Sequence, residues 1–496
     1  MQLSGITYRL ARQTVVAALA LIVIAPVWSP ARAQTKPPSD EAARMWCIGG
    51  EDTSGDKQVA GCTAVLAARK LTDNARKAAY YLRGNAYTAM HVYDRAIADY
   101  SAALKIDPNY AGAYRGRGEA HYQSKEFELA IADHSVYIKM DPNGDGWLGR
   151  SAAYLQTGKL DEAVSDLSEM IKRHPNSAVP YISRGEAYRQ QGELDLALKD
   201  LDRAIALDDE DSYAWFNRGI TYSDRGNPDR AIENYNQAIK LKGDDAWYYN
   251  NRGNSYIDEK QVDLAFADYD RAIKLDPKFA LAYYNRGTAY RDKNDDDHAL
   301  ADFNESIRLD PSYQPAWGNR ARVYRDRGDI DHAFADFNQS LKLNPKASKD
   351  SLARGNLYFD QHRYAEALSD YDTAVANDPK YVSALNARCI TKAILGRAQE
   401  GLTDCEAGLK LSPNEAYTLD SRAFCHLKLG EYDAAIAGFN EALAVKPGLA
   451  NSLYGRALAK ARTGDAEGAK ADIAEALKSN ADIADQFVHY GFAKLE

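Results

Sequence analysis

The hydrophobic pattern of residues 77–483 repeats with a period of 34 residues, apart from one unit of 33. Within each period, apolar or small side chains recur at positions 4, 8, 11, 20 and 24, which is the spacing of two amphipathic helices. A proline at position 32 of most units ends the second helix. The pattern predicts twelve antiparallel helix hairpins, with units at 77–110, 111–143, 144–177, 178–211, 212–245, 246–279, 280–313, 314–347, 348–381, 382–415, 416–449 and 450–483.

The residues at positions 8 and 20 indicate how closely the two helices of a hairpin approach. Position 8 is small in every unit, and position 20 is Ala in eleven units and Gly401 in the other. Because helices pack tightly only where side chains are small, we expect these positions to lie at the contact. The fold class is therefore an all-α solenoid of antiparallel helix hairpins.

An arginine occupies position 7 of every unit, and an aspartate occupies position 23 of ten of them. In a hairpin where positions 8 and 20 face each other, a side chain as long as Arg can reach position 23. We predict structural ion pairs, within a unit or to the adjacent one, such as Arg252 with Asp268 and Arg286 with Asp302. The alternative is a basic stripe that binds a ligand. The arginines are Arg83, Arg117, Arg150, Arg184, Arg218, Arg252, Arg286, Arg320, Arg354, Arg388, Arg422 and Arg456.

Over residues 77–483 the chain resembles the tetratricopeptide repeat family. The small residue at position 8, Tyr at 11, Ala at 20 and Pro at 32 follow that family's signature, while Arg replaces its usual Leu at position 7. The resemblance implies a right-handed superhelix whose first helices, here called helices A, line the concave face. It also implies a non-enzymatic protein–protein interaction scaffold, and the RG-x-A-Y variant is similar to that of exported bacterial repeat proteins.

The first 33 residues form a different kind of segment. Arg9 and Arg12 precede an apolar run over 14–27, and Ala31-Arg32-Ala33 is an A-x-A cleavage signal. We interpret 1–33 as a signal peptide; an uncleaved membrane anchor is the alternative. Localisation in the periplasm of a Gram-negative bacterium, or secretion, is expected, with no further membrane span after cleavage.

Three segments flank the array. Residues 34–39 read as a polar linker, and 40–76 as a degenerate N-terminal capping hairpin with a Gly-rich turn. Residues 484–496 are predicted to form an amphipathic C-terminal capping helix. Repeat arrays need such atypical ends because a regular unit leaves one apolar face uncovered.

Charge and motifs argue against nucleic-acid binding and against catalysis. The formal net charge is −9, and the predicted signal segment carries three arginines and no acidic residue. A mature chain that is more acidic still does not suit phosphate-backbone binding. The GxGxxG letters at 144–149 lack a preceding strand, and the calcium-loop start at 141–146 lacks its final Glu. We therefore predict no enzyme, no metal and no cofactor.

The five cysteines fit an oxidising compartment. Cys47 and Cys62 stand on the two predicted helices of the N-terminal hairpin, so we pair them. Spacing alone lets Cys405 pair with either Cys389 or Cys425. The resemblance to exported repeat proteins favours Cys389–Cys405, with Cys425 free. Unpaired buried thiols are the alternative for all five.

The helix A face that is not needed for packing should bind the partner. Two ladders and several aromatic residues fall there, within 212–360. The Asn ladder resembles those that hold an extended peptide backbone, although Asn is also frequent at this position in the family. The Asp ladder favours a cationic partner. A glycan-binding or polysaccharide-export module is the alternative function; partner identity and oligomeric state are not predicted. The residues are Asn217, Asn251, Asn285 and Asn319 at position 6, Asp224, Asp258, Asp292, Asp326 and Asp360 at position 13, and Tyr213, Phe216, Trp247 and Tyr284.

Overall fold

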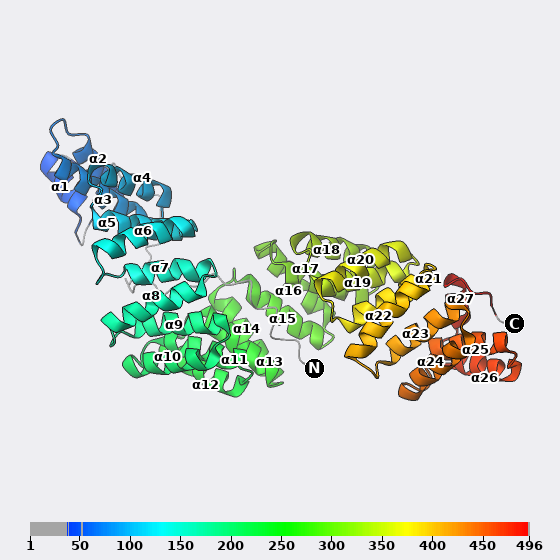
Figure 1. The fold of residues 1–496 in the computed structure, drawn as a ribbon. Helices are drawn as coiled ribbons and strands as arrows, with labels where there is room; N and C mark the ends of the chain where they lie inside the picture. The colour runs from blue at the N-terminus through cyan, green and yellow to red at the C-terminus, as the bar shows by residue number, and fades with distance from the viewer. Residues whose placement is uncertain (1–36, 38, 51–52, 495–496) are drawn as a thin grey trace. The chain divides into compact units, whose positions relative to one another are not determined.

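The structure, a computed structural model, describes residues 37, 39–50 and 53–494. These residues form 27 α-helices and no strand (Figure 1). The predicted signal peptide lies outside the described residues, as does most of the linker. The chain divides into two compact units, Met1–Leu275 and Asp276–Glu496, and each is treated by itself.

The first compact unit contains α1 to α14. Their bounds are α1 Asp40–Ile48, α2 Gly55–Leu66, α3 Asp73–Ala89, α4 Tyr93–Ile106, α5 Ala111–Gln123, α6 Phe127–Met140, α7 Gly146–Gln156, α8 Leu160–Arg173, α9 Ala178–Gln191, α10 Leu194–Leu207, α11 Ser212–Asp224, α12 Pro228–Leu241, α13 Ala246–Asp258 and α14 Val262–Leu275.

The second compact unit contains α15 to α27. Their bounds are α15 Ala280–Asp292, α16 Asp296–Leu309, α17 Gln314–Asp326, α18 Ile330–Leu343, α19 Ser348–Asp360, α20 Tyr364–Asn377, α21 Val382–Ile394, α22 Ala398–Leu411, α23 Ala416–Leu429, α24 Tyr432–Val445, α25 Ala450–Thr463, α26 Ala466–Ser479 and α27 Ile483–His489.

Helices α3 to α26 pair as the hairpins expected from the repeat, with the odd-numbered helix of each pair as helix A. Consecutive helices from α1 to α14 and from α15 to α26 pack against one another, and α27 packs against α25, which confirms the all-α hairpin architecture. Helices α1 and α2 form a further hairpin before the array. Within the described residues, no helix combines the length and apolarity needed to cross a membrane.

The small residue at position 8 makes room for the ring at position 24. A Cβ atom on Gly253 would lie 2.7 Å from a ring carbon of Tyr269, which is 1% exposed. The same contact recurs at Gly84 with Tyr100 and at Gly355 with Tyr371. Position 8 is therefore small because a buried aromatic side chain packs against the helix backbone there.

The turn between helices A and B has one backbone conformation throughout. Position 15 has a positive φ in all twelve repeats, from 59° at His91 to 92° at Gly464. Glycine fills seven of these positions, because it adopts this left-handed conformation without steric cost.

The C-terminal helix is shorter than the sequence predicts. Helix α27 ends at His489, and Gly491 with φ +86° turns the chain away. Residues 490–494 therefore continue as non-helical chain beyond α27, where a helix to the end was expected.

Candidate functional site

Most of the position-7 arginines bind an aspartate of their own hairpin. Nε and Nη2 of Arg252 each donate to a carboxylate oxygen of Asp268 at 2.7 Å. This two-bond pair recurs within all ten units that carry an aspartate at position 23. In each of these pairs the aspartate is buried. The pairs are Arg83–Asp99, Arg117–Asp133, Arg150–Asp166, Arg184–Asp200, Arg252–Asp268, Arg286–Asp302, Arg320–Asp336, Arg354–Asp370, Arg388–Asp404 and Arg456–Asp472.

The third nitrogen of these guanidinium groups ties one repeat to the one before it. Arg252 Nη1 donates to Asn236 Oδ1, at position 25 of the preceding unit, at 2.6 Å. Arg354 makes the same bond to Asn338, and Arg184 bonds Ser168. The sequence analysis left open whether the Arg–Asp pair forms within a unit or between neighbours; it forms within the unit, and the bond to position 25 of the preceding unit was not predicted.

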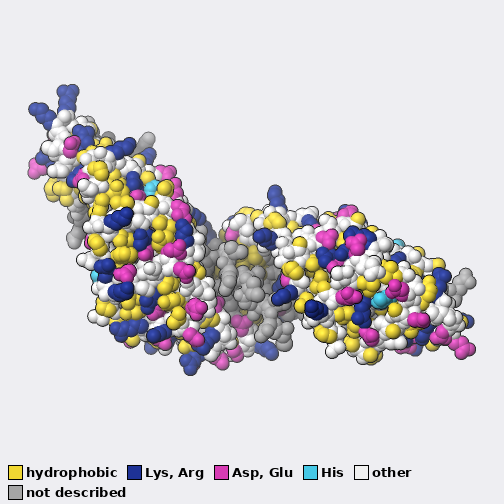
Figure 2. All heavy atoms as spheres, in the orientation of Figure 1, with side chains coloured by type: hydrophobic (Ala, Val, Ile, Leu, Met, Phe, Trp, Pro, Cys, Tyr) yellow, Lys and Arg dark blue, Asp and Glu magenta, His cyan; other side chains and the backbone are white. Residues whose placement is uncertain are grey.

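Aromatic rings at position 4 complete each joint. The Arg218 guanidinium carbon lies 4.5 Å from the ring centroid of Trp215, and that indole donates to the Asp209 carbonyl at 2.9 Å. Trp147 and Trp317 make the equivalent bonds to the preceding turn. The arginine series is therefore occupied by structural contacts, and the face drawn in Figure 2 shows basic and acidic side chains interspersed in each compact unit.

The four ladder asparagines differ in exposure and in partners. Asn217 is 3% exposed and donates to the Tyr213 carbonyl at 2.8 Å, one turn back along α11. Asn251 makes the same bond to the Trp247 carbonyl but is partly exposed. Asn285 is buried.

Asn319 sits in a polar network on the second compact unit. Its amide donates to the Tyr284 hydroxyl at 2.8 Å, and its oxygen accepts from Arg291 at 2.6 Å. Arg322, one turn further on, binds the buried carboxylate of Asp350. Peptide binding by these asparagines stays a prediction, with Asn251 and Asn319 the accessible members.

The position-13 aspartates are all exposed. Asp224 binds Arg189 at 2.6 Å in the first compact unit. In the second, Asp292 binds Arg291 at 2.8 Å and Asp326 binds Arg325 at 2.7 Å, each from the adjacent position in the chain. These ladder carboxylates are held by local cations but remain open to solvent.

Asp258 and Asp360 make no ion pair with the described residues. Desolvation raises the pKa of the Asp258 carboxyl, and Glu259 adds to the shift. Desolvation likewise raises the pKa of Asp360, against the nearby positive charges of Arg325 and His362.

The predicted aromatic residues are only partly accessible. Phe216 is 8% exposed and packs 4.7 Å from the ring centroid of Tyr248, so it is a core residue rather than a contact surface. Tyr213, Trp247 and Tyr284 keep intermediate exposure.

The helix A face also continues past residue 360, where the sequence analysis placed no site. Phe424 on α23 receives the ring of Tyr490 there, at a centroid distance of 5.7 Å, and Phe359, at the end of the predicted region, contacts the same ring at 6.1 Å. An aromatic residue at position 9 or 12 of these helices, together with the Phe-x-x-Tyr spacing of 487–490, was the available signal.

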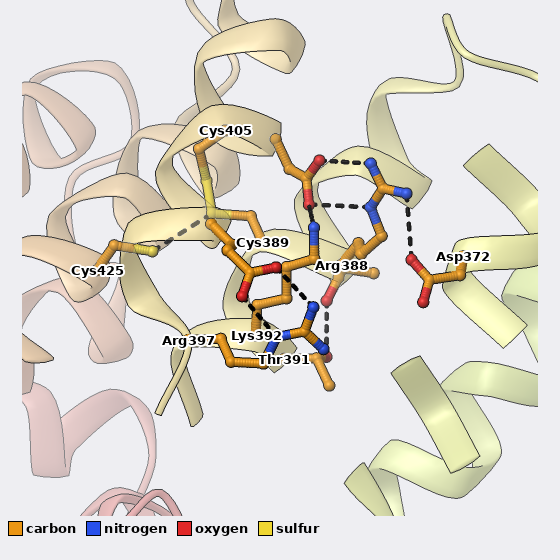
Figure 3. Close-up of polar contacts among 11 residues, drawn as sticks. Asp372, Arg388, Cys389, Thr391, Lys392, Arg397, Cys405 and Cys425 are labelled. Carbon is orange, nitrogen blue, oxygen red and sulfur yellow. Dashed lines mark hydrogen bonds and ion pairs between the residues drawn. A yellow bond between two sulfur atoms is a disulfide. The ribbon is translucent and has the colours of Figure 1, made fainter. Parts of the chain in front are cut away.

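The cysteines form two disulfides. The Cys47 and Cys62 sulfurs lie 2.07 Å apart and the Cys389 and Cys405 sulfurs 2.08 Å apart, with Cys425 as a buried free thiol. The Cys425 sulfur is 3.5 Å from that of Cys389 (Figure 3). Burial, together with Asp404, raises the pKa of the Cys425 thiol to about 12.

We expect native Cys425 to resist both alkylation and exchange with the neighbouring disulfide. A thiol with this pKa holds so little thiolate at pH 8 that its reaction should slow on the order of a thousandfold. Timed iodoacetamide labelling followed by peptide mapping measures this, with the urea-unfolded chain as the control. Rapid native labelling, or a Cys389–Cys425 link in the folded chain, would contradict the expectation.

The hairpins, their position-7 joints and the exposed helix A face together define a helical-repeat scaffold. Family models for the tetratricopeptide repeat match more than half of the chain, and the chain belongs to that family. The model described as TPR repeat matches 84–125, 185–226 and 253–290, and three described as tetratricopeptide repeat match 212–245 and 280–313, 318–382 and 352–416, and 145–177.

Solved structures of repeat proteins are similar to this chain. The MamA protein is 27% identical, with 34% of this chain and 93% of that chain covered and a TM-score of 0.30. Yeast Tom70 is 18% identical, with coverage of 84% and 100% and a TM-score of 0.38. The APC/C hetero-tetramer Cut9–Hcn1 is 15% identical, with coverage of 87% and 97% and a TM-score of 0.40. A comparison with curated proteins finds no match.

Proposed function

We propose that the chain is a non-enzymatic scaffold that binds an extended, basic segment of a partner protein along its helix A face. Tetratricopeptide repeats support a role in protein–protein interaction. Each compact unit presents its own candidate surface: the exposed face of α11 and α13 in the first, and the exposed face of α15, α17 and α19 in the second. The proposed location is the cell envelope, in the periplasm or outside the cell.

The observation that carries the basic character of the partner is the exposed position-13 ladder. Five successive helices A present a carboxylate there, while the position-7 arginines are used inside the hairpins. Asp258 and Asp360 have raised carboxyl pKa values and make no ion pair with the described residues, so a cation supplied by a partner would stabilise their charged forms. Asn251 and Asn319 lie on the same face and could bond a peptide backbone.

The two disulfides support an envelope location. Cys47–Cys62 and Cys389–Cys405 would persist in an oxidising compartment and be reduced in the cytosol. The signal-like segment 1–33 points the same way. Detection of the protein in the periplasmic or culture fraction is the direct check.

Neutralising Asp292, Asp326 and Asp360 together by Asn should weaken partner binding by about tenfold, since exposed charge pairs contribute ~0.2–1 kcal/mol each. Crosslinking mass spectrometry on the envelope fraction measures the partners, and titration with a captured basic segment measures the affinity. Because protonation removes the same charges, binding should also weaken as the pH falls through the raised pKa of Asp360.

The matched control neutralises three exposed carboxylates on helices B, with Glu233→Gln, Asp331→Asn and Asp433→Asn. It changes the net charge by the same amount and should leave binding intact. An unchanged partner list in the ladder variant would refute the assignment of this face. Retention of a purified polysaccharide without any protein partner would replace it with the glycan-binding alternative.

A further inference from the structure

The C-terminal segment 487–492 folds back onto helices that precede it by several repeats. In a repeat array each hairpin contacts only its neighbours, so such a contact is not a consequence of the repeat. Yet His489 stacks on His362, with ring centroids 3.8 Å apart and planes 13° apart. Tyr490 reaches Phe359 and Tyr364, at centroid distances of 6.1 Å and 6.4 Å.

Three aromatic side chains anchor the segment around one residue of helix A. The rings of Phe487, Tyr490 and Phe492 lie 5.8 Å, 5.7 Å and 5.7 Å from the ring centroid of Phe424 on α23. Phe487 and Tyr490 are 2% and 6% exposed. Contacts of this geometry between rings stabilise beyond the area they bury.

A polar contact fixes the backbone of the segment. Lys428 Nζ donates to the Tyr490 carbonyl at 2.6 Å and lies 4.6 Å from the ring centroid of Phe492. This lysine is at position 13, the ladder position that is aspartate in five earlier units. The face therefore binds a peptide carbonyl and flanking rings here, with Lys428 at the position that carries the Asp ladder in the earlier units.

We propose that the helix A face of α19 and α23 is a binding groove for a partner segment with aromatic residues at i and i+2, as at Tyr490 and Phe492, and that residues 490–492 are its intramolecular occupant. A partner segment of this kind displaces the occupant to bind. The inference rests on the proposed function, that partner segments bind along helix A. It adds a second, aromatic groove whose contacts include Phe424 and Lys428, outside 212–360.

The test releases the occupant while keeping α27 as the cap. The Tyr490→Ala/Phe492→Ala variant retains Ile483 and Phe487, which pack in the core of the last repeats. A fluorescent peptide with the sequence of 484–494 should bind this variant at least about tenfold more tightly than the wild-type chain, because the tethered segment competes at an effective concentration of roughly millimolar. The same peptide with Ala in place of its tyrosine should not bind.

Val488→Ala is the matched control, because Val488 lies within the segment but is 46% exposed. It should leave the groove closed and the peptide affinity at the wild-type level. A released variant that melts like the wild type and binds the peptide no better overturns the proposal, since 490–492 then only covers the end of the array.

Hydrogen exchange on the full wild-type chain gives a second measurement that does not depend on a mutant folding. Amides of 490–494 should exchange well before those of α23, as expected for a segment that opens without unfolding the groove. If the amides of 490–494 and those of α23 all exchange only on global unfolding, the proposal is overturned. If the released variant gains peptide affinity and the Asp-ladder variants keep their partners, this groove is supported and the proposed basic site is refuted. If the released variant gains no peptide affinity and the Asp-ladder variants lose their partners, the basic site is supported and this groove is refuted.

Discussion

Replacing Arg252 by alanine is expected to destabilise its region of the array by about 3–5 kcal/mol, because it leaves the buried carboxylate of Asp268 without its partner. Asp268 is 5% exposed, and burial already raises its pKa even with Arg252 in place. The variant also loses the bond from Nη1 to Asn236, which links two repeats. Urea unfolding with hydrogen exchange at α13 and α14 measures the loss locally, since long repeat arrays do not always unfold in one step.

Arg218→Ala is the matched control for this prediction. Its position-23 partner is the neutral Asn234, bound at 2.7 Å, so its removal strands no buried charge in that hairpin. The cost should be about 1–2 kcal/mol, typical of a lost hydrogen bond and packing. Equal losses for Arg218→Ala and Arg252→Ala would show that the buried charge is not the cause.

A second comparison separates charge from shape at the same joint. Arg252→Lys keeps a positive charge but cannot make the two parallel bonds, and should lie between wild type and Arg252→Ala. Replacing both members of the pair, as Arg252→Met/Asp268→Leu, should recover most of the lost stability, because no uncompensated charge remains. The loss in Arg252→Ala should also shrink as the pH falls, because burial raises the pKa of Asp268 and protonation removes the buried charge.

The arginine joint shows how much of the fold can be predicted from the sequence. Period and residue type predicted the hairpins and the pairing of positions 7 and 23, because both lie in one unit. The bond to position 25 of the preceding unit was missed, although that position is Ser, Asn or Asp in most units. A period alone does not define how one hairpin rotates against the next, and that rotation brings position 25 into reach.

Because a period does not define how neighbouring helices pack, part of the candidate site was predicted on the surface but is buried. Phe216 and Asn217 belong to the predicted surface stripe by spacing, yet Tyr248 of the next repeat covers Phe216 and both are buried. Residues at the edge of a helical stripe become core or surface according to the neighbouring helix, which periodicity within one helix cannot reveal. The groove around Phe424 was missed because its occupant is distant in sequence and follows no repeat.

The last repeats are expected to lose stability as the pH rises from about 4 to 7, and Asp420→Asn should remove this loss. Asp420 on α23 is 7% exposed, and burial raises its pKa from 3.8 to about 7, with Glu415 adding to the shift and the bond from Ser452 opposing it. The folded chain therefore holds a proton on Asp420 that the unfolded chain has already released. At pH 8 the ionised, buried carboxylate costs up to about 4 kcal/mol relative to its protonated form.

Asp420→Asn should accordingly be more stable than wild type at pH 8 and nearly equal to it at pH 4. Asparagine has about the same size and still accepts the bond from Ser452 Oγ, which is 2.5 Å from Asp420 Oδ1. Chemical unfolding curves at pH 4, 5, 6, 7 and 8, followed by hydrogen exchange at α23 and α25, give the difference directly.

Asp472→Asn is the contrasting control in the same part of the chain. Burial opposes ionisation of Asp472 too, but Arg456 and Lys460 bond it and hold its pKa below the ordinary value. Ionised Asp472 contributes to the free energy of unfolding above its pKa in the unfolded chain. This contribution is lost as the pH falls through its lower pKa in the folded chain. Asp472→Asn should therefore destabilise the chain at pH 8. Opposite signs for two buried aspartates follow from one difference, the presence of a paired cation. A destabilised Asp420→Asn at pH 8 would instead mean that Asp420 has a cation partner in solution and is ionised there at little cost.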